Sequence, residues 1–313
     1  MTAFERYLDA GRSPTNERAG PEPALWTLVL GLLALISSII VFSIIGMALG
    51  VALAEPVFGI ATDTHDTLQG WMTLIEDHRI LLFATLLGLA SMIPITALLL
   101  WSLHDRSFGS LLGAGRGLHG RNLALGAAAA IVSSTLGMAV LHTTGIVSVT
   151  VQSLAQGWWI IAVLFACLIP LQATAEEVVF RGYFLQGLAN RFRHISWSPL
   201  IWIGLPAILF TAAHLDPESE GGYWPLIAIG GFALFATALV VITGGLSAAI
   251  GYHVANNLMA LLVFEPPFGI EGVGALKISV DAADLPWLML VELLALIGLY
   301  FVLRPLLRRE DEG

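Results

Sequence analysis

Three apolar stretches of the sequence carry polar side chains whose types and spacing suit hydrolytic chemistry. In chain order they hold Glu176, Glu177 and Arg181, then Phe210 and His214, then His253 and Asn257. A carboxylate can take a proton from water, and a histidine can orient that water or protonate a leaving amine. An asparagine amide can donate to a developing oxyanion. We therefore interpret these residues as a candidate hydrolytic site that needs no serine or cysteine nucleophile.

The spacing of these residues predicts how they face one another on helices. Glu177 and Arg181 are four residues apart with the acid first, which is the favoured order for an ion pair. Glu176 is turned by about 100° from Glu177 on a helix. Glu176 can therefore face a different space, and the two acids need not share a partner. His253 and Asn257 are also four apart and are expected on one helix face.

Other readings of the same residues stay open at this point. One glutamate and two histidines form a catalytic zinc ligand set, although the ligands would have to converge from three helices. Glu176 and its neighbours also suit an interfacial helix, His214 a span end, and His253 an interhelical hydrogen bond. We read Glu292, a lone acid in the last apolar stretch, as a packing or interface residue. The remaining histidines, including His104, are read as solvated.

The composition indicates the elements that must position these residues. Of 313 residues, 57% are apolar and only 12% are charged, and the mean hydropathy is +0.83. A soluble domain carries roughly 25% charged residues. These values exclude an ordinary soluble enzyme, a disordered chain and a nucleic-acid binder. They predict an all-α, polytopic integral membrane protein.

Eight apolar runs predict about eight transmembrane helices. They are residues 24–52, 80–101, 123–141, 158–171 continuing towards 192, 199–213, 224–242, 246–264 and 285–303. With the N-terminus inside, eleven arginines fall in inside segments, whereas the outside loops hold only Arg79 and Lys277. This bias predicts that both termini lie in the cytoplasm.

The predicted organisation is a single membrane domain with short tails. Residues 1–23 are expected to be a cytoplasmic N-terminal tail, residues 24–304 the transmembrane domain, and residues 305–313 a cytoplasmic C-terminal tail. The connection 55–79 is expected to hold a short surface helix. Glu176 lies about 27 Å along its helix from Trp158, near the predicted cytoplasmic side, whereas His214 ends the next span near the outside. Kinks at Pro170 and Pro206 are one way to bring the two residues together.

The three motifs, in this order and each on its own span, resemble the CPBP family. That family holds the CAAX prenyl endopeptidases and the bacterial bacteriocin-processing and immunity-type membrane proteins. The resemblance covers about residues 173–262, within a family-like core of about 155–264. It implies an intramembrane glutamic endopeptidase without a cofactor, with zinc as the alternative.

By the same resemblance, each motif residue has an implied role. Glu176 would activate water together with His214, His253 and Asn257 would stabilise the oxyanion, and Glu177 and Arg181 would hold the site together. Phe210 belongs to the supporting residues. The substrate would be a membrane-associated or lipid-modified peptide or protein.

The expected location and the competing functions complete the interpretation. We expect the chain in a bacterial or archaeal plasma membrane, with the lipid bilayer as its surroundings and no nucleic acid as partner. The alternatives are a non-proteolytic scaffold or immunity-type protein with the same fold, a zinc-dependent protease, and a transporter or channel. The transporter would be favoured by inverted repeats with broken helices, which the sequence does not show.

Overall fold

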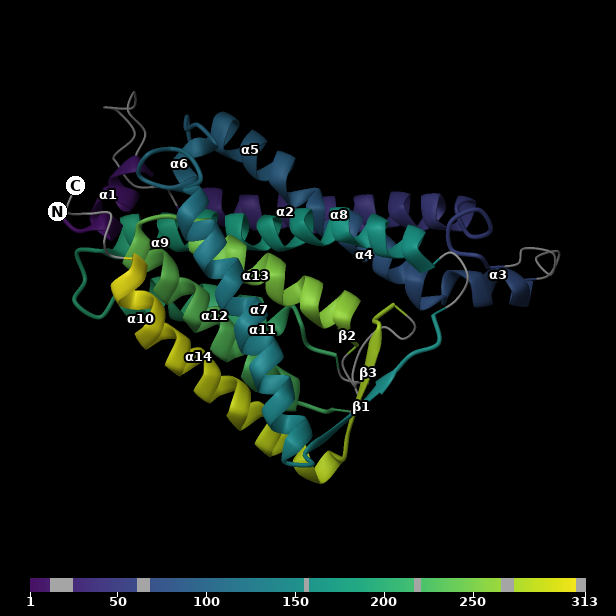
Figure 1. The fold of residues 1–313 in the computed structure, drawn as a ribbon. Helices are drawn as coiled ribbons and strands as arrows, with labels where there is room; N and C mark the ends of the chain where they lie inside the picture. The colour runs from purple at the N-terminus through teal and green to yellow at the C-terminus, as the bar shows by residue number, and fades with distance from the viewer. Residues whose placement is uncertain (12–24, 61–67, 155–157, 217–220, 266–272, 308–313) are drawn as a thin grey trace.

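The computed structural model describes residues 1–11, 25–60, 68–154, 158–216, 221–265 and 273–307. In this part of the chain, six helices are long and apolar enough to cross a membrane. They are α2 (Leu25–Ala52), α4 (His78–Ala90) with α5 (Met92–Leu103), α7 (Gly120–Thr143), α8 (Trp158–Glu177) continuing through η1 (Val178–Phe184) and α9 (Leu185–Phe192), α12 (Trp224–Thr243), and α14 (Leu285–Leu307). The prediction of a polytopic helical membrane protein is confirmed (Figure 1).

Two further apolar helices are shorter than the six. They are α10 (Pro199–Trp202) with α11 (Gly204–Ala212), and α13 (Ser247–Leu258) with the π-helix η2 (Met259–Val263). All eight apolar runs predicted from the sequence are therefore helical. At ~1.5 Å per residue the α10–α11 segment reaches only about 20 Å, less than the ~30 Å of a hydrocarbon core.

Helices α7 and α13 pack closely enough for their backbones to touch. A Cβ atom on Gly126 of α7 would lie 2.1 Å from the carbonyl oxygen of Ala248, and one on Gly251 of α13 would lie 2.0 Å from that of Leu123. Any larger residue at either glycine would push the two helices apart. This contact fixes α13, which carries His253 and Asn257, against α7.

The first residues of the chain are part of the packed structure and not a free tail. Helix α1 (Ala3–Ala10) starts with a capping box of Thr2 and Glu5. The Tyr7 hydroxyl is fully buried and lies 3.0 Å from the carbonyl oxygen of Leu111 and 3.2 Å from that of Arg181. The Gln186 amide donates to the Tyr7 carbonyl at 2.8 Å. The sequence interpretation missed this helix, although Thr2 followed by Glu5 is a signature of a helix N-terminus.

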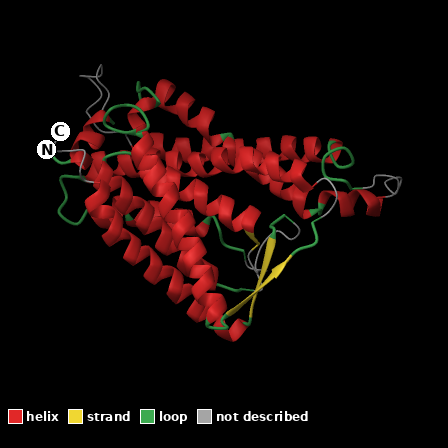
Figure 2. Ribbon diagram, in the orientation of Figure 1, coloured by secondary structure: helices red, strands yellow, loops and turns green. Residues whose placement is uncertain are grey.

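Three short strands at the other end of the bundle form a sheet that the sequence interpretation did not include. The order is β1 (Val147–Val151), β3 (Leu276–Val280), β2 (Phe264–Glu265), with β1 antiparallel and β2 parallel to β3 (Figure 2). The remaining short elements are α3 (Leu68–Ile75), α6 (Gly109–Leu112) and η3 (Ala282–Asp284). The short helix α3 is the one expected in the connection 55–79.

His104, read from the sequence as solvated, is instead half-buried just after α5. Its Nε2 atom lies 2.8 Å from the hydroxyl oxygen of Tyr183. Burial, assisted by the positive charge of Arg106, lowers the pKa of His104 from its usual 6.5 to about 4. The neutral ring is therefore the form that the folded protein favours.

This arrangement predicts acid sensitivity of the fold. The unfolded chain takes up a proton at His104 near pH 6.5, whereas the folded protein does so only near pH 4. The free energy of unfolding should therefore fall as pH is lowered between these values. We expect His104→Gln to flatten this part of the profile, measured by thermal unfolding in detergent. The exposed His78, changed to Gln, is the matched control, and an unchanged profile in His104→Gln would contradict the assignment.

Candidate active site

The first predicted motif lies where an α-helix changes into a π-helix. Glu176 and Glu177 end α8, and the π-helix η1 begins at the next residue and contains Arg181. Such π-helical turns are frequent at functional sites. The continuous helix runs from Trp158 to Phe192, so Glu176 lies near its middle. The run predicted to continue from residue 158 towards residue 192 is therefore one helix, with Glu176 near its middle.

Glu177 is the centre of a buried ionic cluster. Its Oε1 atom accepts from Nη1 of Arg181 at 3.0 Å and lies 2.8 Å from Nδ1 of His253. The side chains of Arg181 and Glu177 are 2% and 0% exposed. The ion pair predicted from the four-residue spacing is present and links α8 to η1. The contact with His253 links α8 to α13.

Glu176 contacts the same histidine through the other ring nitrogen. Its Oε2 atom lies 3.4 Å from Nε2 of His253, and the side chain is 5% exposed. The two acids therefore share His253 as a partner, which the helix spacing had left open. The two nitrogens lie on opposite sides of the imidazole ring, so a single ring inserted from α13 reaches both carboxylates although they diverge on their own helix.

The charges of the cluster balance only when all four side chains are counted, those of Glu176, Glu177, Arg181 and His253. Two carboxylates and one guanidinium leave one negative charge, which a protonated His253 would neutralise. Among the described residues, Glu176 Oε2 has no hydrogen-bond donor. A buried oxygen of this kind is costly unless it is paired. It is therefore available to a proton or to a water molecule.

Aromatic rings enclose the cationic side of the cluster. The guanidinium carbon of Arg181 lies 4.3 Å from the centre of the Phe210 ring and 5.4 Å from that of Phe232. The Phe232 ring centre is in turn 4.7 Å from that of His253. A cation over an aromatic face is stabilised, more so when both are desolvated. Phe210, predicted as a supporting residue, therefore covers Arg181.

His214 follows the short helix α11 and lies at the depth of the other motif residues. Its Nδ1 atom lies 2.8 Å from the Phe210 carbonyl oxygen, and the two rings are 4.6 Å apart between centres. It lines the same cavity as His253 and Asn257. The structure therefore brings His214 to the cavity whose wall carries His253, the histidine that Glu176 contacts.

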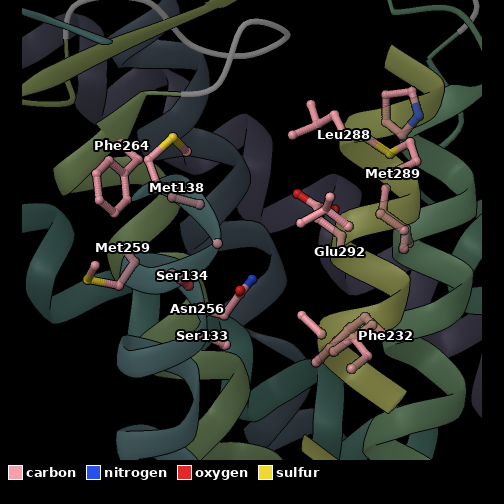
Figure 3. A pocket seen from close by; sticks show the side chains of 18 of the residues that line it. Ser133, Ser134, Met138, Phe232, Asn256, Met259, Phe264, Leu288, Met289 and Glu292 are labelled. Atoms are coloured by element: carbon pink, nitrogen blue, oxygen red, sulfur yellow. The ribbon is translucent and has the colours of Figure 1, made fainter. Parts of the chain in front are cut away.

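The cavity has a volume of about 410 Å³ and lies between α7, α11, α12, α13 and α14. Its walls are mainly apolar. The polar side chains that line it are Ser133, Ser134, His214, Tyr252, His253, Asn256, Asn257 and Glu292. Figure 3 shows part of this lining, with Glu292 on one wall and Asn256 and the two serines on the other.

Several of these residues were missed from the sequence. Glu292 was read as a packing or interface residue, although an acid inside an apolar span is by itself a signal for a functional site. Gln172 was not considered, yet it is buried and its Oε1 atom accepts from Nδ2 of Asn257 at 3.1 Å. Its signal was a polar side chain four residues before Glu176. Ser133 and Ser134 gave none, because serine is common in membrane helices.

The positions of Glu176, His214 and His253 do not suit the binding of a metal ion by all three. Among the described residues, no group of three or more His, Cys, Asp or Glu side chains is arranged to hold one. Glu176 and His253 are adjacent, whereas His214 contacts its own helix. The three-residue zinc set considered from the sequence is therefore not assembled, and we assign no step to a metal.

Comparison with known proteins agrees with the motifs. Residues 156–259 match the family described as type II CAAX prenyl endopeptidase Rce1-like. A stretch of 115 residues is 30% identical to uncharacterized protein YyaK of Bacillus subtilis (strain 168), covering 36% of this chain and 37% of that protein. No solved structure matches the chain. The family match contains all seven predicted site residues, from Glu176 to Asn257. Residues 156–259, about a third of the chain, are therefore similar to the CAAX prenyl endopeptidase family.

Proposed function

We propose that this protein is an intramembrane endopeptidase in which Glu176 activates the attacking water. The observation that supports this most is the Glu176 carboxylate, which is buried, has an oxygen without a donor among the described residues, and contacts a histidine on the cavity wall. A carboxylate in this position can act as a general base. The substrate would be a membrane-associated or lipid-modified peptide or protein.

In the proposed reaction, the water gives one proton to Glu176 and its oxygen attacks the carbonyl carbon of the scissile peptide bond. The carbonyl becomes an oxyanion that Asn257 and His253 stabilise, since both line the cavity on α13 and the Nε2 atom of His253 contacts Glu176 at 3.4 Å without a hydrogen bond. When the C–N bond breaks, the proton passes from Glu176 to the leaving amine. The products are a carboxylic acid, which keeps the second proton of the water, and an amine; at neutral pH that proton moves to the amine to give a carboxylate and an ammonium group. Glu176 returns to its starting form.

The other motif residues act by holding these groups in place. Glu177 and Arg181 fix the ring of His253 through the hydrogen bonds described above. Gln172 takes one amide hydrogen of Asn257, which leaves the second for the oxyanion. His214 would orient the water from the opposite side of the cavity. Preorganised donors of this kind supply much of the rate enhancement in hydrolases.

We also propose how the protein sits in its membrane. The protein is an integral membrane protein by its long apolar helices. The arginine bias supports placing the end that carries α1 in the cytoplasm of a bacterial or archaeal cell and the sheet outside. Arg106 and Arg193 contact Gln186 and Asp9 at the α1 end, in line with this orientation.

The test is peptide cleavage by purified protein in detergent, with and without a strong chelator. The probes are quenched fluorogenic peptides of apolar sequence, with and without a prenylated cysteine. We expect cleavage that the chelator leaves unchanged, because the proposed mechanism uses only Glu176 and its neighbours. Cleavage that is lost with chelator and restored by zinc would overturn the proposed mechanism, and absence of cleavage of all probes would count against the activity.

A further inference from the structure

Glu292 is an acid on the cavity wall that the proposed reaction does not use. It extends from α14 into the cavity, across from Asn256 on α13 (Figure 3). Its side chain is open to the cavity and forms no hydrogen bond or ion pair with any described residue. A charged group at this depth costs on the order of 3 kcal/mol on insertion scales and commonly marks a substrate pathway.

The rest of the lining provides no positive charge for this carboxylate. Among the described residues that line the cavity there is no lysine or arginine, and the two histidines lie on α13 and beside α11. The histidine of α13 is already placed between Glu176 and Glu177. Glu292 is therefore an acidic group without a cationic neighbour among the described residues of the cavity wall, and a cationic ligand would supply that partner.

The surroundings of Glu292 fit a long cationic side chain better than a small cation. Leu288 and Met289 lie on the same wall, and Met138 on α7 faces them across the cavity (Figure 3). Lysine and arginine pack their methylene stems against apolar surface while the charged end seeks a polar partner. Leucine and methionine side chains supply the apolar surface, and Glu292 supplies the partner.

We infer that Glu292 is a specificity-determining residue that receives a lysine or arginine side chain of the peptide substrate. This inference rests on the proposed function, because it assumes a peptide in the cavity. The peptide would lie with its scissile bond towards His253 and Asn257 on α13 and with the basic side chain towards α14. An acidic residue at that position of the peptide would be excluded by like-charge repulsion.

The test uses binding, so that it does not depend on cleavage. Fluorescent peptides of alanine and leucine carry one central lysine, norleucine or glutamate, and they are titrated into detergent-solubilised Glu176→Gln protein, which keeps the cavity and does not turn over. We expect the lysine peptide to bind about tenfold or more tightly than the norleucine peptide, as close charge pairs at interfaces do. Glu292→Gln in the same background should remove the preference, and Glu292→Lys should transfer it to the glutamate peptide.

The outcomes separate this inference from the proposed function. Equal binding of the lysine and norleucine peptides, no binding of either, or a preference that survives in folded Glu292→Gln protein would each overturn the role of Glu292. A thermal unfolding transition in each variant identifies the folded protein, and Glu292→Asp should retain the preference if the carboxylate is what matters. A lysine preference in binding together with no cleavage by wild-type protein would count against the proteolytic activity alone.

Discussion

Glu176→Gln is expected to reduce peptide cleavage by about 10²–10⁴-fold, the contribution typical of a general base. The amide has the size of the carboxylate but cannot take the proton of the attacking water. The contact of this side chain with His253 is an ion-pair distance of 3.4 Å and not a hydrogen bond, so the substitution should leave the fold intact. The measurement is kcat/KM on the fluorogenic peptides, with thermal unfolding alongside.

The matched control for this variant is an acid outside the cavity. Glu76 is exposed in the turn before α4, and Glu76→Gln should cleave at the wild-type rate. If folded Glu176→Gln protein keeps most of its activity, the base must be another group, and the proposed mechanism fails while the similarity of residues 156–259 to the family stands.

Arg181→Met is expected to have the largest effect on stability, a loss of about 3–5 kcal/mol in the free energy of unfolding. Methionine fills much of the arginine volume, but the substitution leaves Glu177 buried with only His253 to neutralise the two acids. The cation over the Phe210 ring is lost as well. The measurement is chemical or thermal unfolding of purified protein in detergent.

Two companion variants make this result interpretable. Arg193→Met breaks the exposed pair with Asp9, whose oxygen lies 3.5 Å away, and should cost less than about 1 kcal/mol. The double variant Glu177→Gln with Arg181→Met removes the uncompensated charge and should recover part of the lost stability. A single Arg181→Met variant as stable as Arg193→Met would show that the cluster does not support the fold.

The membrane helices could be predicted from the sequence because a helix that crosses the hydrocarbon core needs about 20 consecutive, mainly apolar residues. All eight apolar runs are helical. The depth of the site could not be predicted in the same way. The apolar run after Trp158 ends before Glu176, but the helix continues to Phe192, since charged residues that pair inside the protein do not stop a helix.

Within the site, only the contact between residues that are close in the sequence could be predicted. Glu177 and Arg181 are neighbours by helix periodicity, and their pair is present. The insertion of His253 between the two acids depends on how α13 packs against α8, which no local spacing records. Glu292 reaches the cavity for the same reason, because the placement of α14 is set by packing and not by its sequence.

The elements outside the apolar runs were the hardest to foresee. The strands β1 and β3 are far apart in the chain, and their pairing, from Val147 opposite Val280, closes one end of the bundle. Helix α1 is held to η1 and α9 by hydrogen bonds. The Tyr7 hydroxyl donates to the Arg181 carbonyl oxygen, and the Gln186 amide donates to the Tyr7 carbonyl oxygen. Contacts of this kind between distant segments leave no periodic pattern in either partner.

The π-helix η1 constrains how many residues lie between Glu177 and Leu185, whatever the types of those residues. A π-helix closes its hydrogen bonds over five residues where an α-helix closes them over four. Removing one residue between Glu177 and Leu185 would close this turn as an α-helix and redirect the side chains within it, Arg181 among them. Gln186 and Asn190, which lie beyond the turn, would stay close to the α1 carbonyls that they bind. Among relatives, the count of residues in this turn should therefore vary less than their identities.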